Sequence, residues 1–243
     1  MIKGIDTAAT ISTTAAKQLK ELGFDFAVRY VVPPKGGLAW KALVDWEAQA
    51  IREAGLAILP CWETTTNRAR SGAAAGRDDG KTAAERAQEL GIPAGTVICF
   101  AIDYNPPKTD YPAITEYLCN ASSAAAPYRM GVYAPSAVVR EMQSLIPAYW
   151  WRTYAWNDGD CNADAYQTEY QDSAAAQAVR KQVGFAVDLD EAKSLSGMWE
   201  AIKPLPEDLL WAREHGFLED GQPDDAVTKS EMATILRRLY GWI

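Results

Sequence analysis

Residues 96–103 read TVICFAID, an almost unbroken apolar run that closes on an aspartate. Such a run is typical of a strand buried on both faces of a parallel sheet. A helical pattern over residues 81–90 precedes it and stops at Gly91. The same order of helix, glycine and strand leads into DFAVRYV at 25–31 and LAILPCW at 56–62. This repetition predicts an α/β fold with a parallel sheet.

The pattern continues on both sides of this region. Further strands are predicted at residues 1–5, 128–134, 149–156, 165–171 and 183–190, and further helices at 15–22, 43–54, 112–125 and 137–146. Helix signals weaken between the last strands. About eight parallel-type strands within about 200 residues predict a (β/α) TIM-like barrel with degraded last helices, over residues 1–202.

Composition narrows the classes of function. Of the 243 residues, 48% are hydrophobic and 23% are charged, which is enough apolar content for a sizeable core. The formal net charge of −8 argues against nucleic acid as a partner, because phosphate binding requires clustered Lys and Arg. No apolar run approaches the roughly 20 residues of a membrane helix, so membrane insertion is not expected. The chain starts MIKGID, without a basic and then apolar leader, so we expect no Sec-type signal peptide.

Metal and histidine-dependent chemistry have little support. The four cysteines form no CxxC pair, and the single histidine, His215, lies far from them in the sequence. We therefore expect no metal site and no cofactor. One histidine near the C-terminal end also weakens Ser-His-Asp or Cys-His catalysis. Carboxylates are therefore the candidate catalysts. Separately, the nine Trp and eleven Tyr would suit stacking on sugar rings.

In a (β/α) barrel, functional groups lie at the carboxyl ends of the strands. Acids, amides and aromatic residues occupy these positions here. In chain order they include Asp6, Arg29, Tyr30, Trp62, Glu63, Asp103, Asn105, Tyr133, Trp151, Gln167, Asp188 and Asp190. They predict one rim rich in acids and aromatic rings, although strand ends are also polar in many proteins simply because strands meet loops there.

Five short motifs occur in a familiar order. They are GIDTA on the first strand, FAIDYN on the fourth, MGVYA on the fifth, YQTEYQ on the seventh and FAVDLDEA on the eighth. In this order the chain resembles the glycoside hydrolase family 25 lysozymes, and more closely the glycoside-hydrolase-like domains of the Rv2525c type, over about residues 1–200. The resemblance implies cleavage of the β-1,4 bond between N-acetylmuramic acid and N-acetylglucosamine by carboxylates at a barrel mouth.

The resemblance also assigns residues by matching motifs. Asp6 matches the first-strand aspartate, Asp103 the first acid of the family's fourth-strand DxE motif, and Asp188 the eighth-strand aspartate. The glutamate of DxE, which protonates the leaving oxygen in the family, falls on Asn105 here. An amide cannot donate that proton, and glycoside hydrolysis needs one carboxyl that can. Either another acid takes over or activity is lost.

Glu63 is the candidate replacement. It follows Trp62 at the end of the neighbouring strand, and apolar flanking would favour the protonated acid. Asp103 is the alternative donor, and a substrate-assisted mechanism, in which the sugar's own acetamido group is the nucleophile, stays open. The predicted catalytic residues are Asp6, Glu63, Asp103 and Asp188, and the predicted substrate-binding residues are Arg29, Tyr30, Trp62, Asn105, Tyr133, Trp151 and Gln167.

The end of the chain differs from the barrel in pattern. Residues 203–208, KPLPED, are predicted to form a linker. Residues 209–243 show two helical patterns around a glycine-containing loop and resemble one surface-layer-homology-like repeat, which implies cell-wall binding. Such a short hairpin needs a partner surface, so a homodimer through these helices is also predicted, and a plain helical cap on the barrel is the alternative.

Three functions compete on these observations. The first is a peptidoglycan-degrading glycoside hydrolase, a muramidase-like phage or prophage endolysin made in the host cytoplasm and released by a holin or by lysis. The second is a catalytically inactive barrel that binds cell-wall glycan, motivated by Asn105. The third, an α/β enzyme for phosphorylated substrates, is weakened because the late strands carry no glycine-rich phosphate loop.

Overall fold

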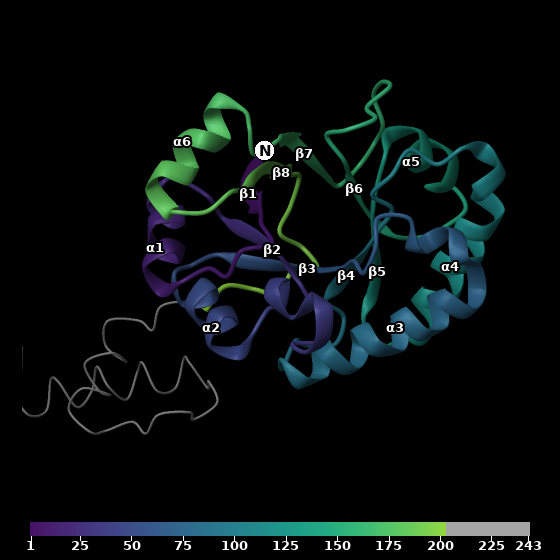
Figure 1. Cartoon of the computed structure of the whole chain (residues 1–243), viewed down its shortest axis with the longest axis horizontal. Helices are drawn as coiled ribbons and strands as arrows, with labels where there is room; N and C mark the ends of the chain where they lie inside the picture. Colours follow the sequence, from purple (N-terminus) through teal and green to yellow (C-terminus); the bar gives the residue numbers. More distant parts are fainter. Residues whose placement is uncertain (203–243) are drawn as a thin grey trace, which may run out of the picture. The chain divides into compact units, whose positions relative to one another are not determined.

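The computed structural model describes residues 1–202, which form a closed barrel of eight strands in sequential order (Figure 1). The predicted linker and surface-layer-homology-like segment lie outside these residues. The strands are β1 (Ile2–Asp6), β2 (Phe26–Tyr30), β3 (Ala57–Trp62), β4 (Val97–Ala101), β5 (Arg129–Ala134), β6 (Tyr149–Arg152), β7 (Ala165–Glu169) and β8 (Asp188–Ala192).

Helices lie outside the strands (Figure 1). They are α1 (Thr13–Glu21), α2 (Asp45–Glu53), α3 (Gly72–Glu89), α4 (Tyr111–Ala124), α5 (Ser136–Met142) and α6 (Ala174–Val183), with short 3-10 helices η1 (Gly36–Lys41), η2 (Arg68–Ser71) and η3 (Lys108–Asp110). The residues between β6 and β7 form no helix, as the weak signal predicted, but α6 between β7 and β8 is a regular helix. A capping serine begins α6, since the Ser173 hydroxyl accepts a hydrogen bond from the Ala176 N–H.

The all-parallel barrel predicted from the sequence is wrong at its last strand. Strands β1 to β7 pair in parallel, but β8 pairs antiparallel with both β7 and β1. The apolar residues before Asp188 belong to the connection from α6, and the strand itself runs down from the mouth over residues 188–192 rather than up over 183–190. The fold is therefore a closed mixed barrel rather than a regular (β/α) repeat.

Helix α3 is almost twice as long as the predicted helix at residues 81–90. Its first half, GAAAGRDD, is rich in small residues that resemble a loop signal. Two of its glycines face α4 at very short range: a Cβ on Gly76 would lie 2.2 Å from the Tyr117 carbonyl, and one on Gly80 would lie 2.5 Å from that of Ala121. Close contact between two helix backbones thus accounts for glycines inside this helix.

Two apolar layers hold the barrel together. One fills the space between the strands and the surrounding helices and includes Leu19, Ile51 and Ile114. The other fills the inside of the barrel with Phe26, Leu59 and other strand residues. Polar residues replace this inner packing towards the carboxyl ends of β1 to β7, which leaves a cavity there. Within residues 1–202, no helix has the length and apolar character needed to cross a membrane.

Candidate active site

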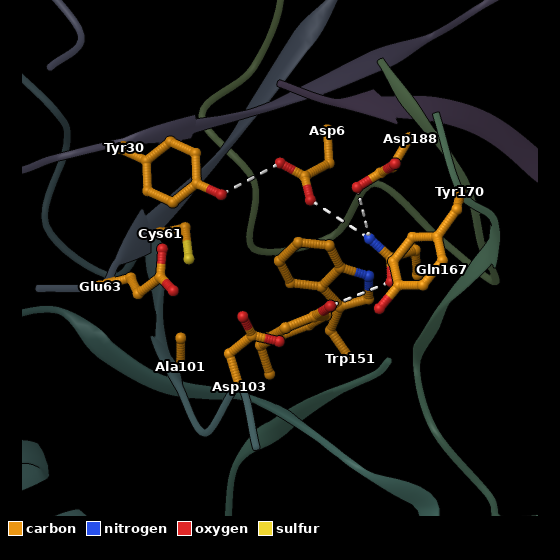
Figure 2. A pocket seen from close by; sticks show the side chains of 11 residues that line it. Asp6, Tyr30, Cys61, Glu63, Ala101, Asp103, Trp151, Gln167, Tyr170 and Asp188 are labelled. Atoms are coloured by element: carbon orange, nitrogen blue, oxygen red, sulfur yellow. Dashed lines mark hydrogen bonds between the residues drawn. The ribbon is translucent and has the colours of Figure 1, made fainter. Parts of the chain in front are cut away.

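A cavity of about 120 Å³ opens at the barrel mouth and is lined by carboxyl groups. All four predicted catalytic acids lie on its wall, namely Asp6, Glu63, Asp103 and Asp188. Figure 2 shows Asp6 and Asp188 on one side of the cavity and Glu63 and Asp103 on the other. The structure therefore brings together acids from four different strand ends, and we call this space the acid cavity.

The reversed direction of β8 puts two of these acids side by side. Asp6, at the end of β1, pairs in register with Asp188, at the start of β8. Residues directly opposite one another in an antiparallel pair project from the same face of the sheet. Gln167 on β7 links the two carboxylates, because its amide donates a hydrogen bond to Asp188 at 3.1 Å and a long one to Asp6 at 3.5 Å.

A further aspartate, Asp190, lies deeper in the barrel. Asp190 is 2% exposed, and one of its carboxyl oxygens accepts a hydrogen bond from the Trp151 indole at 2.8 Å, while the other has no partner among residues 1–202. Burial, and then the charge of Asp6, raises the pKa of Asp190 well above its usual range. Burial and the charge of Asp188 likewise raise the pKa of Asp6. Both groups therefore hold their proton to a higher pH than an ordinary aspartate does.

Asp103 has the properties of a proton donor. It follows β4 and is partly buried, and no hydrogen bond within residues 1–202 involves its carboxyl oxygens. Burial, assisted by the charges of Glu63 and Asp188, raises the pKa of Asp103 to about 6. Burial also raises the pKa of Asp188 to about 6, although the Gln171 N–H opposes this by donating to the carboxylate at 2.6 Å.

The apolar setting expected for Glu63 is wrong. Lys41 on η1 donates a hydrogen bond to its carboxylate at 2.8 Å, and the two side chains form a largely buried ion pair. Trp62 does not flank the carboxylate in the cavity, because successive side chains of a strand point to opposite faces. Trp62 is 3% exposed and packs in the layer between strands and helices, so the predicted sugar contact of Trp62 is also wrong.

Two further substrate-binding predictions are corrected. Arg29 is fully buried and pairs with Glu47 at 2.7 Å, so it cannot touch a bound sugar. Its guanidinium instead donates to the carbonyls of Thr7 and Lys41, which ties together the loops that follow β1 and β2. Asn105 is exposed in the loop after β4 and is not among the residues that line the acid cavity, so its predicted contact with substrate in this cavity is wrong.

The remaining predicted residues lie on the wall of the acid cavity. Tyr30 donates a long hydrogen bond to Asp6, and Tyr133 donates to the side-chain oxygen of Gln167 at 3.0 Å. Trp151 packs on Tyr133 with 4.2 Å between ring centroids, and it is so deeply buried that it supports the cavity floor rather than presenting a free ring face.

Sequence reasoning missed Tyr170 and Lys41. Tyr170 lies in the predicted seventh-strand motif, but the sequence did not single it out as a site residue. The structure places it on the wall of the acid cavity, just after β7 (Figure 2). Lys41 has no local signal in the sequence, since its role depends on the ion pair with Glu63, the residue after β3. In the part of the chain that the structure describes, no group of three or more His, Cys, Asp or Glu side chains has an arrangement that would hold a metal ion.

A family model described as "Rv2525c-like, glycoside hydrolase-like domain" matches residues 17–215. The chain belongs to this Rv2525c-like family. The crystal structure of the Tat-secreted protein Rv2525c of Mycobacterium tuberculosis, in complex with L-tartrate, is similar with a TM-score of 0.68 and 25% identity over 81% of this chain and 98% of that one.

The Rv2525c-like chain is also similar to one further protein in sequence and to one in structure. The uncharacterised protein FadG of Bacillus subtilis is 28% identical over 149 residues, which are 56% of this chain and 25% of FadG. The chain thus spans about a quarter of the length of that relative. A glycosyl hydrolase 25 of Streptococcus pneumoniae shares the fold, with a TM-score of 0.52 and 11% identity over 80% of this chain and 88% of that one. This Rv2525c-like domain therefore has a glycoside-hydrolase-like fold, which it shares with that glycosyl hydrolase 25.

Proposed function

We propose that this domain is a glycoside hydrolase that cleaves the glycan strand of peptidoglycan, with Asp103 as the general acid. The observation that carries the proposal is the convergence of four carboxyl groups on one small cavity. Such closely placed acids cannot all be ionised together, so protonated and ionised carboxyls coexist at neutral pH. Glycoside hydrolysis requires this combination.

The roles follow from the surroundings of each acid. Asp103 delivers its proton to the glycosidic oxygen as the bond between that oxygen and the anomeric carbon breaks. Burial raises the pKa of Asp103 to about 6, and its carboxyl has no hydrogen-bond partner in the described part of the chain. Glu63, paired with Lys41, serves as the carboxylate that stabilises the cationic ring or takes the proton of the attacking water. Asp188 and Gln167 hold the sugar hydroxyls.

The substrate class rests on relatives. The match to the glycoside-hydrolase-like family and the shared fold with a glycosyl hydrolase 25 support a glycan. Rv2525c is described as Tat-secreted, which supports action outside the cytoplasm. The phage origin, release by lysis and dimerisation stay predictions from the sequence.

A barrel that binds cell-wall glycan without cleaving it is the second candidate. The observation in its favour is Asn105, which stands where the resembling lysozymes have their acid and which lies outside the acid cavity. In this case the acids would bind hydroxyl groups, and Asp103 would be a ligand for the sugar rather than a proton donor.

One experiment separates the two candidates. Purified peptidoglycan is incubated with the full chain, reduced with borohydride and analysed by mass spectrometry for new reducing ends. We expect reduced muramic acid ends with the wild type, a loss of about two to four orders of magnitude in Asp103→Asn, and no change in Asp78→Asn, an exposed control on α3. Wall binding without any new ends would overturn the hydrolase and favour the binder.

A further inference from the structure

A second and wider cavity adjoins the acid cavity. It measures about 480 Å³, and part of its wall consists of Asp6, Tyr30 and Asp188, which also line the acid cavity. The remaining wall comes from the loops after β1 and β2, from the turn after β7 and from the residues just before β8. The mechanism proposed above uses only the narrow cavity, so the wide cavity has no role in it.

The wall of the wide cavity combines an exposed aromatic ring with small apolar and polar groups. Trp40 on η1 lies on this wall, and the side chain is 65% exposed. Ala9 and Val187 add apolar surface, and Gln171 adds an amide. A flat ring beside a few hydrogen-bonding groups suits a ligand with an apolar face and polar edges, which is the character of a pyranose ring.

The loop that presents Trp40 is held in place by the next residue. Lys41 forms the ion pair with Glu63 and lies 4.4 Å from the centroid of the Tyr30 ring. Its carbonyl accepts a hydrogen bond from Arg29. Because these contacts fix η1, the indole is presented on a preorganised loop, and little conformational entropy is lost when a ligand stacks on it.

We propose that the wide cavity is a second sugar subsite, in which Trp40 stacks on the pyranose next to the one held over Asp103 in the same strand. The inference rests on the proposed function, since it extends that site. The shared wall indicates which ligand occupies the wide cavity, because a glycan strand bound in the acid cavity would extend into the space next to it. Asp6 and Asp188 can accept hydrogen bonds from hydroxyl groups, so the subsite best fits an uncharged sugar of the strand, namely its N-acetylglucosamine.

The test uses N-acetylglucosamine oligomers from the dimer to the hexamer, with affinity measured by isothermal titration calorimetry on the full chain. Trp40→Ala should weaken binding of the longer oligomers about tenfold and leave the shortest bound oligomer unchanged, and Trp40→Phe should recover part of the loss. Trp46→Ala is the matched control, because Trp46 on α2 is 56% exposed and lines neither cavity.

The outcomes distinguish this inference from the function on which it rests. If the wild type binds the oligomers and Trp40→Ala binds every length equally well, the subsite is overturned while the proposed function stands. A loss of equal size at all lengths would also overturn it, because it would mean that the variant disturbs the acid cavity through Lys41. If the wild type binds neither the oligomers nor peptidoglycan, the proposed function fails and the subsite fails with it.

Discussion

The substitution Asp103→Asn should make the protein more stable and inactive at the same time. The Asp103 carboxyl is partly buried, lacks a hydrogen-bond partner within residues 1–202 and faces other acids. Folding therefore costs free energy whenever this group is ionised. Asparagine has nearly the same shape and no charge, so the variant removes this cost together with the transferable proton.

The size of the effect follows from the pKa. Burial raises the pKa of Asp103 from the usual 3.8 to about 6 in the folded state. The proton is bound more tightly by the folded chain, so its stabilising contribution is complete below pH 3.8 and is lost as the pH rises through about 6. Linkage sets an upper bound of about 3 kcal/mol at pH 8. Solvent screening of this partly exposed group reduces the expected gain to ~1–2 kcal/mol.

Urea unfolding at pH 4 and at pH 8, followed by tryptophan fluorescence, measures this difference in the free energy of unfolding. We expect Asp103→Asn to gain ~1–2 kcal/mol at pH 8 and less than ~0.5 kcal/mol at pH 4. Asp78→Asn should show no such difference between the two pH values. A variant that is less stable than the wild type at pH 8 would refute the reasoning, because the carboxylate would then make net favourable contacts.

Three further predictions concern the rate and the framework of the site. The rate of wall hydrolysis should fall about tenfold per pH unit above about 6, because burial sets the pKa of Asp103 there and only the protonated acid donates; a rate that is constant to pH 8 would contradict this. Gln167→Leu should lower the rate about 100-fold, because the carboxyl groups of Asp6 and Asp188 lose the amide that holds them in place. Gln88→Leu, on the exposed face of α3, should leave the rate unchanged in the same assay. Arg29→Met should lower the free energy of unfolding by about 3–5 kcal/mol, since it leaves the buried Glu47 carboxylate without its cationic partner. Adding Glu47→Leu should recover part of this loss. Equal stability of the single and double variants would count against a buried ion pair.

Much of the fold could be predicted because its signals are local. A strand such as β4 is marked by continuous apolar residues, and the ends of helices by glycines such as Gly23 and Gly55, whose positive φ angles other residues rarely adopt. The length of α3 could not be predicted, since Gly76 and Gly80 are explained only by the close contact with α4.

The candidate site likewise has features that local sequence predicts and features that depend on tertiary contacts. By itself the sequence determined that acids such as Asp6 and Asp103 stand at strand ends, because a buried apolar strand must give way to polar residues where it reaches solvent. Only the tertiary structure decided which neighbours each acid meets. The antiparallel direction of β8 sets Asp188 beside Asp6, and Lys41 reaches Glu63 across 22 residues of chain. Periodicity records which face of an element is buried, but charge pairing and strand direction depend on contacts between distant segments, which no local pattern contains.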